Sequence, residues 1–274
     1  MRTEMYAAAT DIHVAGEMFR VVSWRDTHCL QVKNLADYQD MMLKDVSLRR
    51  TMREPRGHKD MYLCVLTPPV SEKAQAGVVI MNVSGACRYH AGAYVAVATF
   101  LMEVEGKRKD VMQFDGLTGR IEVMIDRQSR HYTIREPIYE MDDSGRVVTM
   151  DEVIQVEKTS LDLSVDMLTH VREAWLNARR CYDPFDLLFL YNERTFLTVT
   201  NAGHIDRSPL SGAMVHAQLK KQDGMVRIQN FLGHEINGER KDHVLYLYPH
   251  AFVVGLMRFV VDPEDPLKEG FWIE

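Results

Sequence analysis

The feature that most constrains the fold is a strand-to-helix turn that occurs twice in the chain. Residues 90–95 read HAGAYV and residues 210–215 read LSGAMV, so each copy has a bulky residue, a small residue and Gly-Ala at the start of a helix. Each copy lies where a strand pattern gives way to a helical one. The repeated turn predicts two half-domains of like construction that face one site.

The order of the predicted elements favours an α+β fold. Strands and helices mix along the chain without the regular βαβ period of a Rossmann-type sheet. The length of 274 residues fits one large domain or two halves of roughly 130 residues each. We place the two half-domains at residues 1–120 and 121–274, with an alternative in which the C-terminal strands return to the first half.

Periodicity, glycines and prolines predict the individual elements. Strands are expected at 61–69, 76–85, 185–192 and 194–201, strand pairs at 11–22 and 244–262, and a series of short alternating strands over 117–157. Helices are expected at 35–54, 91–107, 159–180 and about 211–221.

The composition excludes several classes of protein. Lys and Arg number 33 against 39 Asp and Glu, a net charge of −6, and without a long basic cluster nucleic-acid binding is not expected. No apolar run approaches the ~18 residues of a membrane span, and the N-terminus lacks a signal peptide's apolar run. We expect no metal and no cofactor, because no ligand set, phosphate loop or dinucleotide fingerprint is present. The four cysteines lack CxxC spacing, which indicates reduced thiols in a cytoplasmic protein; they stand at positions 29, 64, 87 and 181.

Four blocks of sequence, in order along nearly the whole chain, resemble the proline racemase family. They are DIHVAGEMFRVV (11–22), REPRGHKDMYLCVLTPP (53–69), IDRSP (205–209) and DPEDPLKEGFWI (262–273). The chain is therefore identified as a member of this family, which shares a two-lobed fold with diaminopimelate epimerase. The resemblance implies two pseudo-symmetric half-domains with the site between them, a small amino-acid substrate, no cofactor, and a homodimer.

The resemblance breaks at the two catalytic cysteines. Family racemases carry one cysteine in an MCGHG turn and another in DRSPCGTGT, each before a helix whose amides hold the substrate carboxylate. Here His90 stands at the first position and Leu210 at the second, and SGAM replaces GTGT. Cys87 lies too early in the chain, unless a shift in the turn brings it to the site. The Gly-Gly segment that lines the family's pocket is also missing.

A mechanism in which a single base removes the α-proton is still compatible with these changes. Leu210 neither donates nor accepts a proton, so racemisation by two thiols at these positions is excluded. An imidazole with an unperturbed pKa of about 6.5 is a credible general base, and one-base members of the family dehydrate 3-hydroxyproline. The resemblance therefore implies a lyase, dehydratase or isomerase that acts on a proline-like or other small amino acid, with His90 as base.

The other site residues follow from the same comparison. The substrate carboxylate is expected at the amides of two helix N-termini, and Asp206 is expected to hold the substrate amine. Leu210 and Tyr94 complete the predicted pocket, and His13 and His58 are candidates for a proton relay. The predicted amide donors are Ala91, Gly92, Ser211 and Gly212.

Each residue also has a purely structural interpretation. A lone histidine before a helix is commonly a cap, Asp206 can hold the DRSP turn through backbone amides, and His13 and His58 can hydrogen-bond within the fold. For the whole chain, the loss of both thiols and of the pocket segment favours a non-catalytic relative that binds or scaffolds. The enzyme is preferred over this pseudoenzyme alternative, because Asp206, both glycine-containing helix starts and one ionisable residue are kept.

Overall fold

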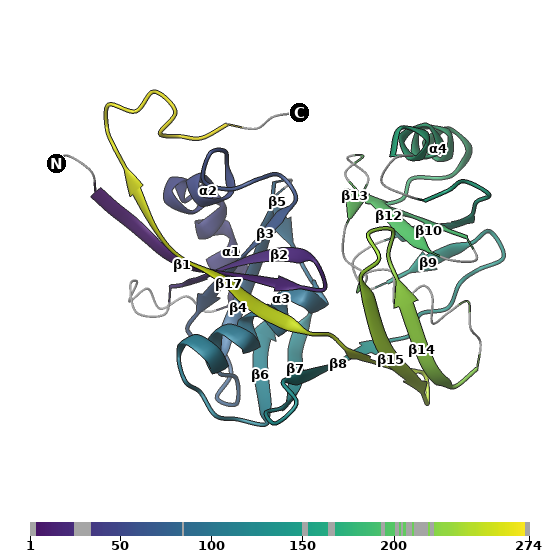
Figure 1. Ribbon diagram of the computed structural model, residues 1–274, viewed down its shortest axis with the longest axis horizontal. Helices are drawn as coiled ribbons and strands as arrows, with labels where there is room; N and C mark the ends of the chain where they lie inside the picture. Colours follow the sequence, from purple (N-terminus) through teal and green to yellow (C-terminus); the bar gives the residue numbers. More distant parts are fainter. Residues whose placement is uncertain are drawn as a thin grey trace. The chain divides into compact units, whose positions relative to one another are not determined.

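The chain forms two compact units, shown in Figure 1, which are described separately below. The first comprises Met1–Arg130 and Ala251–Glu274, and the second comprises His131–His250. Helices and strands mix in both, which confirms the α+β class. The computed structural model describes residues 4–24, 34–83, 85–149, 153–163, 168–192, 195–200, 203, 205–206, 210, 219 and 222–271.

A mixed sheet forms the framework of the first unit. Its strands follow the order β7-β6-β4-β3-β2-β1-β17, and the short β5 (Gly85–Cys87) also pairs with β4. The pairs β2/β3 and β4/β6 are parallel and the other neighbours antiparallel. In Figure 1 the yellow β17 lies along the purple β1, although the two are at opposite ends of the sequence. The strands are β1 (Glu4–Val14), β2 (Glu17–Ser23), β3 (Met61–Thr67), β4 (Ala76–Asn82), β6 (Val111–Gly116), β7 (Gly119–Asp126) and β17 (Ala251–Val261).

Helix α3 (Ala91–Thr99) fills one side of this sheet. All of its residues are buried, as expected for a helix that is apolar all round. It contacts β1, β2, β3, β7 and β17. Since β7 and β17 are at opposite ends of the strand order, the sheet must curl around the helix. The predicted helix 91–107 is confirmed, but it continues as a π-helix over Phe100–Val104 and ends before Gly106, whose φ is +69°.

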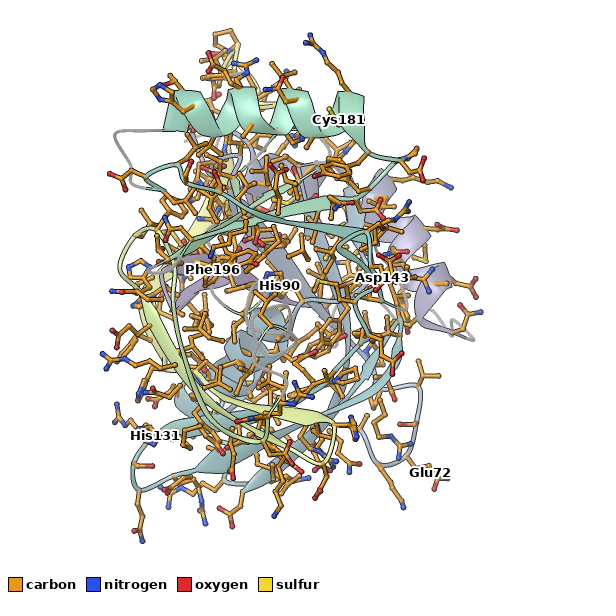
Figure 2. All side chains as sticks on the ribbon, turned by 90° about the vertical axis from the view of Figure 1, so that its right-hand side faces the viewer. Glu72, His90, His131, Asp143, Cys181 and Phe196 are labelled. Carbon is orange, nitrogen blue, oxygen red and sulfur yellow. The ribbon has the colours of Figure 1, made fainter. Side chains whose placement is uncertain are left out.

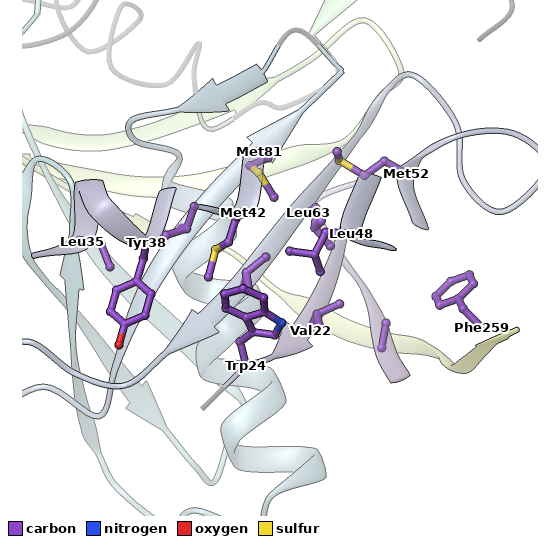
Figure 3. Close-up of a cluster of buried hydrophobic side chains, with 13 residues drawn as sticks. Val22, Trp24, Leu35, Tyr38, Met42, Leu48, Met52, Leu63, Met81 and Phe259 are labelled. Atoms are coloured by element: carbon purple, nitrogen blue, oxygen red, sulfur yellow. The ribbon is translucent and has the colours of Figure 1, made fainter. Parts of the chain in front are cut away.

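The other side of the sheet is covered by α1 (Leu35–Lys44) and α2 (Val46–Met52). The sequence predicts one helix over 35–54, but the structure has two, because α1 ends just before Asp45. The Asp45 side chain caps α2 and accepts hydrogen bonds from the amides of Ser47 at 2.8 Å and Leu48 at 3.3 Å. An aspartate favours such a cap over a helix interior. Figure 3 shows the buried cluster beneath these helices, which includes Val22, Trp24, Leu35, Tyr38, Met42, Leu48, Met52, Leu63, Met81 and Phe259.

A buried ion pair ties this second face together. Arg20 on β2 lies directly opposite Asp11 on β1, and two of its nitrogens donate to the two carboxylate oxygens at 2.7 Å. The guanidinium also donates to the carbonyls of Thr51, at the end of α2, and of Arg56, and it lies over the ring of Phe259. One side chain thus joins the β1–β2 hairpin to the α2 segment.

The second unit contains two sheets and one described long helix. One sheet has the order β14-β15-β16-β8, and the other has the order β13-β12-β11-β10-β9. Helix α4 (Leu168–Cys181) packs through Val171, Trp175 and Ala178 on a cluster that includes Leu188 and Val199, with the exposed Cys181 at its end (Figure 2). The strands are β8 (His131–Pro137), β9 (Arg146–Val148), β10 (Val153–Lys158), β11 (Leu187–Tyr191), β12 (Phe196–Thr200), β13 (Ile205–Asp206), β14 (Gly224–Gln229), β15 (Glu235–Lys241) and β16 (Val244–Tyr248).

Most of the predicted elements are confirmed. The strands expected at 61–69, 76–85, 185–192 and 194–201 are β3, β4, β11 and β12, and the expected pair at 244–262 is β16 and β17. The helix expected at 159–180 is shorter, because 161–163 are not helical and the described part begins at Leu168. The helix expected at about 211–221 lies almost entirely outside the described residues. Among the described helices, none is long and apolar enough to cross a bilayer.

Candidate functional site

His90 caps the buried helix α3. Its backbone is extended (φ −156°, ψ 115°), and its Nδ1 accepts a hydrogen bond from the Gly92 amide at 3.1 Å. The amide of Ala93 donates to the His90 carbonyl, also at 3.1 Å. Both the main chain and the side chain of His90 therefore satisfy amides of the first helical turn. The cap interpretation of His90 is confirmed, and its role as a base stays a prediction.

Two aromatic rings from neighbouring strands enclose this imidazole. Phe19 on β2 and Tyr62 on β3 lie side by side in the parallel register, and their rings stack at 5.6 Å. The His90 ring lies 5.1 Å from the ring of Phe19 and 4.6 Å from that of Tyr62. His90, labelled in Figure 2, is only 8% exposed. The imidazole therefore packs against both rings, which restricts its rotation.

A buried carboxylate faces the other imidazole nitrogen. Glu17 Oε2 lies 3.1 Å from His90 Nε2, and Glu17 is 3% exposed. Glu17 is the first residue of β2, directly after the turn at Ala15 and Gly16, where φ is positive at both residues. Glu17 belongs to the DIHVAGEMFRVV block, but it was not among the candidate site residues predicted from the sequence. Its partner comes from another part of the chain, so no local pattern could have revealed the pair.

Gly92 allows β2 to approach the start of α3. A Cβ atom at this position would lie 2.7 Å from Phe19 Cζ and 3.3 Å from His90 Cε1. Only glycine leaves room for both rings. The amide of Gly92, predicted to bind a substrate carboxylate, already donates to His90. A carboxylate bound at that amide would have to displace the imidazole cap, and carboxylate binding by Ala91 and Gly92 stays a prediction.

Tyr94 lies in the interior of the first unit. It is fully buried on α3, its ring lies 6.2 Å from that of Phe114, and its hydroxyl fills the space that a Cβ on Gly116 would need. The ring of Tyr89 lies 5.7 Å from it on another side. Tyr94 therefore supports the helix that carries His90, and its predicted role in lining a pocket stays untested.

Two cysteines, Cys64 and Cys87, lie near Glu17 and His90. Cys87 belongs to β5, and its thiol donates to the carbonyl of Tyr89 at 3.1 Å. The helix-cap position itself is occupied by His90. Cys64 is fully buried on β3, and burial, with smaller contributions from Cys87 and Glu17, raises its pKa well above the usual value. Cys64 is therefore a protonated core thiol at neutral pH. Cys64, Cys87 and Cys181 form no disulfide with one another.

The two candidate relay histidines make structural contacts. His13 stacks on Phe252, its partner across the β1/β17 pair, at 5.1 Å. The Nδ1 of His58 accepts the amide of Asp60 at 3.3 Å in the turn before β3. The hydrogen bond of His58 is the kind that the structural interpretation expects. The contact shown for His13 is a ring stack, and a relay role stays a prediction for both histidines.

The remaining candidate residues belong to the second unit. Asp206 lies on β13, opposite Thr198 of β12. Leu210 is 3% exposed and helical. Ser211 and Gly212 lie outside the described residues. What the structure brings together within the first unit is thus Glu17, Phe19, Tyr62, His90 and Gly92.

Known proteins resemble the chain over its whole length. It is 24% identical to the proline racemase of Acetoanaerobium sticklandii, with 97% of this chain and 98% of the relative covered. It is also 24% identical to the trans-3-hydroxy-L-proline dehydratase of Bacillus thuringiensis, with 99% of each covered. These relatives are an isomerase and a lyase, in agreement with the expected enzyme class.

The fold has solved counterparts as well. A hydroxyproline epimerase from Agrobacterium vitis with bound trans-4-OH-L-proline superposes with a TM-score of 0.77 at 18% identity, covering 100% of this chain and 96% of the other. The predicted epimerase-type architecture is therefore correct. The family model described as proline racemase matches residues 9–158. Since that match spans more than half of the chain, the protein belongs to the proline racemase family.

Proposed function

We propose that this protein catalyses one-base abstraction of the α-proton of a proline-like or other small amino acid, without a cofactor. The observation that carries the proposal is the buried Glu17–His90 pair at the start of α3, with 3.1 Å between Oε2 and Nε2. A pair of titratable groups held by rigid elements is what general base catalysis requires. In the simplest form His90 is the base, and the reaction is that of a lyase, a dehydratase or an isomerase.

Several residues are assigned supporting roles in this proposal. Asp206 binds the substrate amine, and Tyr94 and Leu210 shape the substrate pocket. The substrate carboxylate is held by amides of Ala91 and Gly92 and, at the second helix start, of Ser211 and Gly212. The relatives named as a proline racemase and a trans-3-hydroxy-L-proline dehydratase support a cyclic amino-acid substrate.

The decisive experiment is α-proton exchange in D2O followed by ¹H NMR. The wild-type protein, incubated with proline, the hydroxyprolines and a small panel of other amino acids, is expected to exchange the α-proton of at least one of them. His90→Ala is expected to reduce that exchange by ~10²–10⁴-fold, the usual contribution of a positioned acid or base. His131→Ala, an exposed histidine of the second unit, serves as the matched control and is expected to keep full activity.

The same experiment tests the alternative of a non-catalytic binding or scaffold protein. That alternative is supported by Leu210, which stands where the family's second thiol would be and is almost fully buried. Absence of exchange across the whole panel, with the protein folded, would favour it. Exchange in the wild type that His90→Ala leaves intact would place the chemistry elsewhere in the protein.

We further propose that the protein is a homodimer that pairs through β17. This strand is 11 residues long and ends the strand order of the first unit. It exposes Phe252, Val254 and Leu256, the last of them 73% exposed, and carries one charge, Arg258. A long apolar edge strand with so little charge is prone to pair with another strand, and a two-fold axis makes two copies antiparallel.

If the protein dimerises through β17, one charged side chain introduced on this strand is expected to lower the molecular mass in solution to that of a monomer. Light scattering is expected to give about twice the chain mass for the wild type and the chain mass of 31.6 kDa for Leu256→Lys. Val148→Lys changes another highly exposed apolar residue, on β9, and is expected to leave the dimer intact. A monomeric wild type, or a Leu256→Lys variant that stays dimeric, would contradict the proposal.

A further inference from the structure

The hydrogen bond that His90 Nδ1 accepts indicates where the proton of the ring lies. Its Nδ1 accepts the Gly92 amide proton at 3.1 Å, so that nitrogen presents a lone pair and carries no hydrogen. In a neutral imidazole the hydrogen must then be on Nε2. This is the nitrogen that lies 3.1 Å from Glu17 Oε2. In the resting state neither imidazole nitrogen has a lone pair available for a substrate proton.

The Glu17 carboxylate attracts a positive charge on His90, but the start of α3 opposes protonation of the ring in two ways. An imidazolium carries a hydrogen on Nδ1, which would point at the amide hydrogen of Gly92 and abolish the cap. It would place a positive charge at the N-terminus of α3, where the helix dipole favours negative charge. The ring cannot turn freely to escape this conflict, since Phe19 and Tyr62 pack against it.

Glu17 has the properties that His90 lacks. Its carboxylate has lone pairs on both oxygens and lies beside the N–H of a neutral imidazole. It is held at the first position of β2, a strand paired on both sides with β1 and β3. A carboxylate at the N-terminal end of a helix is also favoured by the dipole.

Building on the proposed function, we propose that Glu17 is the proton acceptor of this site and that His90 is the positioning residue that orients it. The substrate Cα–H bond breaks, its electron pair moves toward the substrate carboxylate as an enolate, and the proton forms a carboxylic acid on Glu17. The acid then returns the proton to Cα, or gives it to a departing β-hydroxyl, which leaves as water. The histidine keeps its Nε2 hydrogen throughout.

Two variants separate this assignment from a histidine base. Glu17→Gln keeps the size of the side chain and removes its basicity, and it is expected to lower the α-proton exchange rate by ~10²–10⁴-fold. His90→Asn replaces the cap with another good capping residue that cannot take a proton; because it changes a positioning residue, it is expected to lower the exchange rate, but at least ~10-fold less than Glu17→Gln does. Glu17→Asp is expected to restore part of the activity that Glu17→Gln loses.

The outcomes are distinguishable from failure of the proposed function. A loss of exchange in a folded His90→Asn protein as large as that in Glu17→Gln, or retention in Glu17→Gln, overturns the assignment while the α-proton chemistry stands. If His90→Asn does not fold, His90→Ser, which keeps a capping oxygen, takes its place. A wild type inactive on the whole panel counts against the function instead.

The position of the hydrogen on the His90 ring can also be measured without any activity assay. In ¹⁵N-labelled wild-type protein, two-bond ¹H–¹⁵N correlations of His90 are expected to report a neutral ring with its hydrogen on Nε2 at pH 7. A hydrogen on Nδ1, or an imidazolium, overturns the assignment even if no substrate has been found.

Discussion

Replacing Asp11 with alanine is expected to lower the free energy of unfolding by about 3–5 kcal/mol, the cost of leaving one member of a buried ion pair alone. Arg20 and Asp11 are each 4% exposed and share two hydrogen bonds of 2.7 Å. Without the carboxylate, the guanidinium keeps its bonds to the carbonyls of Thr51 and Arg56 but retains an uncompensated charge in the interior. Urea denaturation followed by circular dichroism measures the loss.

An exposed ion pair of the same unit provides the control for this variant. Arg127 lies 2.5 Å from Asp110, but both side chains are largely in solvent. Arg127→Ala is therefore expected to change the free energy of unfolding by less than ~1 kcal/mol. If Asp11→Ala is no more costly than Arg127→Ala, the buried pair does not hold the hairpin as described.

Replacing Gly92 with alanine is expected to reduce both stability and activity. In an exposed helix the change would be favourable by roughly 1 kcal/mol, but here the new Cβ would lie 2.7 Å from Phe19 Cζ. Phe19 is fully buried and cannot move aside, so overpacking is expected to cost about 1–3 kcal/mol. The displaced His90 ring is expected to lower the exchange rate at least ~10-fold, as a small misplacement of a reacting group can.

Gly255→Ala is the matched control for this clash. Its Cβ would approach the end of the Met257 side chain at 3.3 Å, and that methionine is exposed and flexible. We expect unchanged exchange and a change in unfolding free energy within ~0.5 kcal/mol. Equal effects of the two alanines on exchange would show that the approach of β2 to the start of α3 does not matter for the site.

Local patterns predicted most of the elements of the first unit. A short apolar run closed by two prolines predicted β3, and an apolar sequence ended by a glycine predicted α3, because these signals act over a few residues. The break at Asp45 was missed, since the apolar spacing continues across it while the side chain favours a cap. His90 was correctly considered as a cap, because its position just before a helical run is itself a local signal.

The candidate site was predicted only in part. His90 could be chosen as a candidate because it stands just before a predicted helix. Its contacts with Glu17, Phe19 and Tyr62 could not be predicted, because they depend on how β2 and β3 pair beside α3. The direction of the imidazole hydrogen bond also depends on the folded geometry of the cap. Composition and periodicity carry no information about either, so the tautomer of His90 could be inferred only from the structure.

Side chains along β2 alternate between the two faces of the sheet, and each face has a different set of contacts. Arg20 and Val22 face α2 and the buried cluster, while Glu17 and Phe19 face α3. The tight turn at Ala15 and Gly16 fixes which set faces which way. An insertion or deletion of one residue there would turn Arg20 toward α3 and Glu17 toward the apolar cluster. The length of this turn is therefore as strictly constrained as any residue of the site.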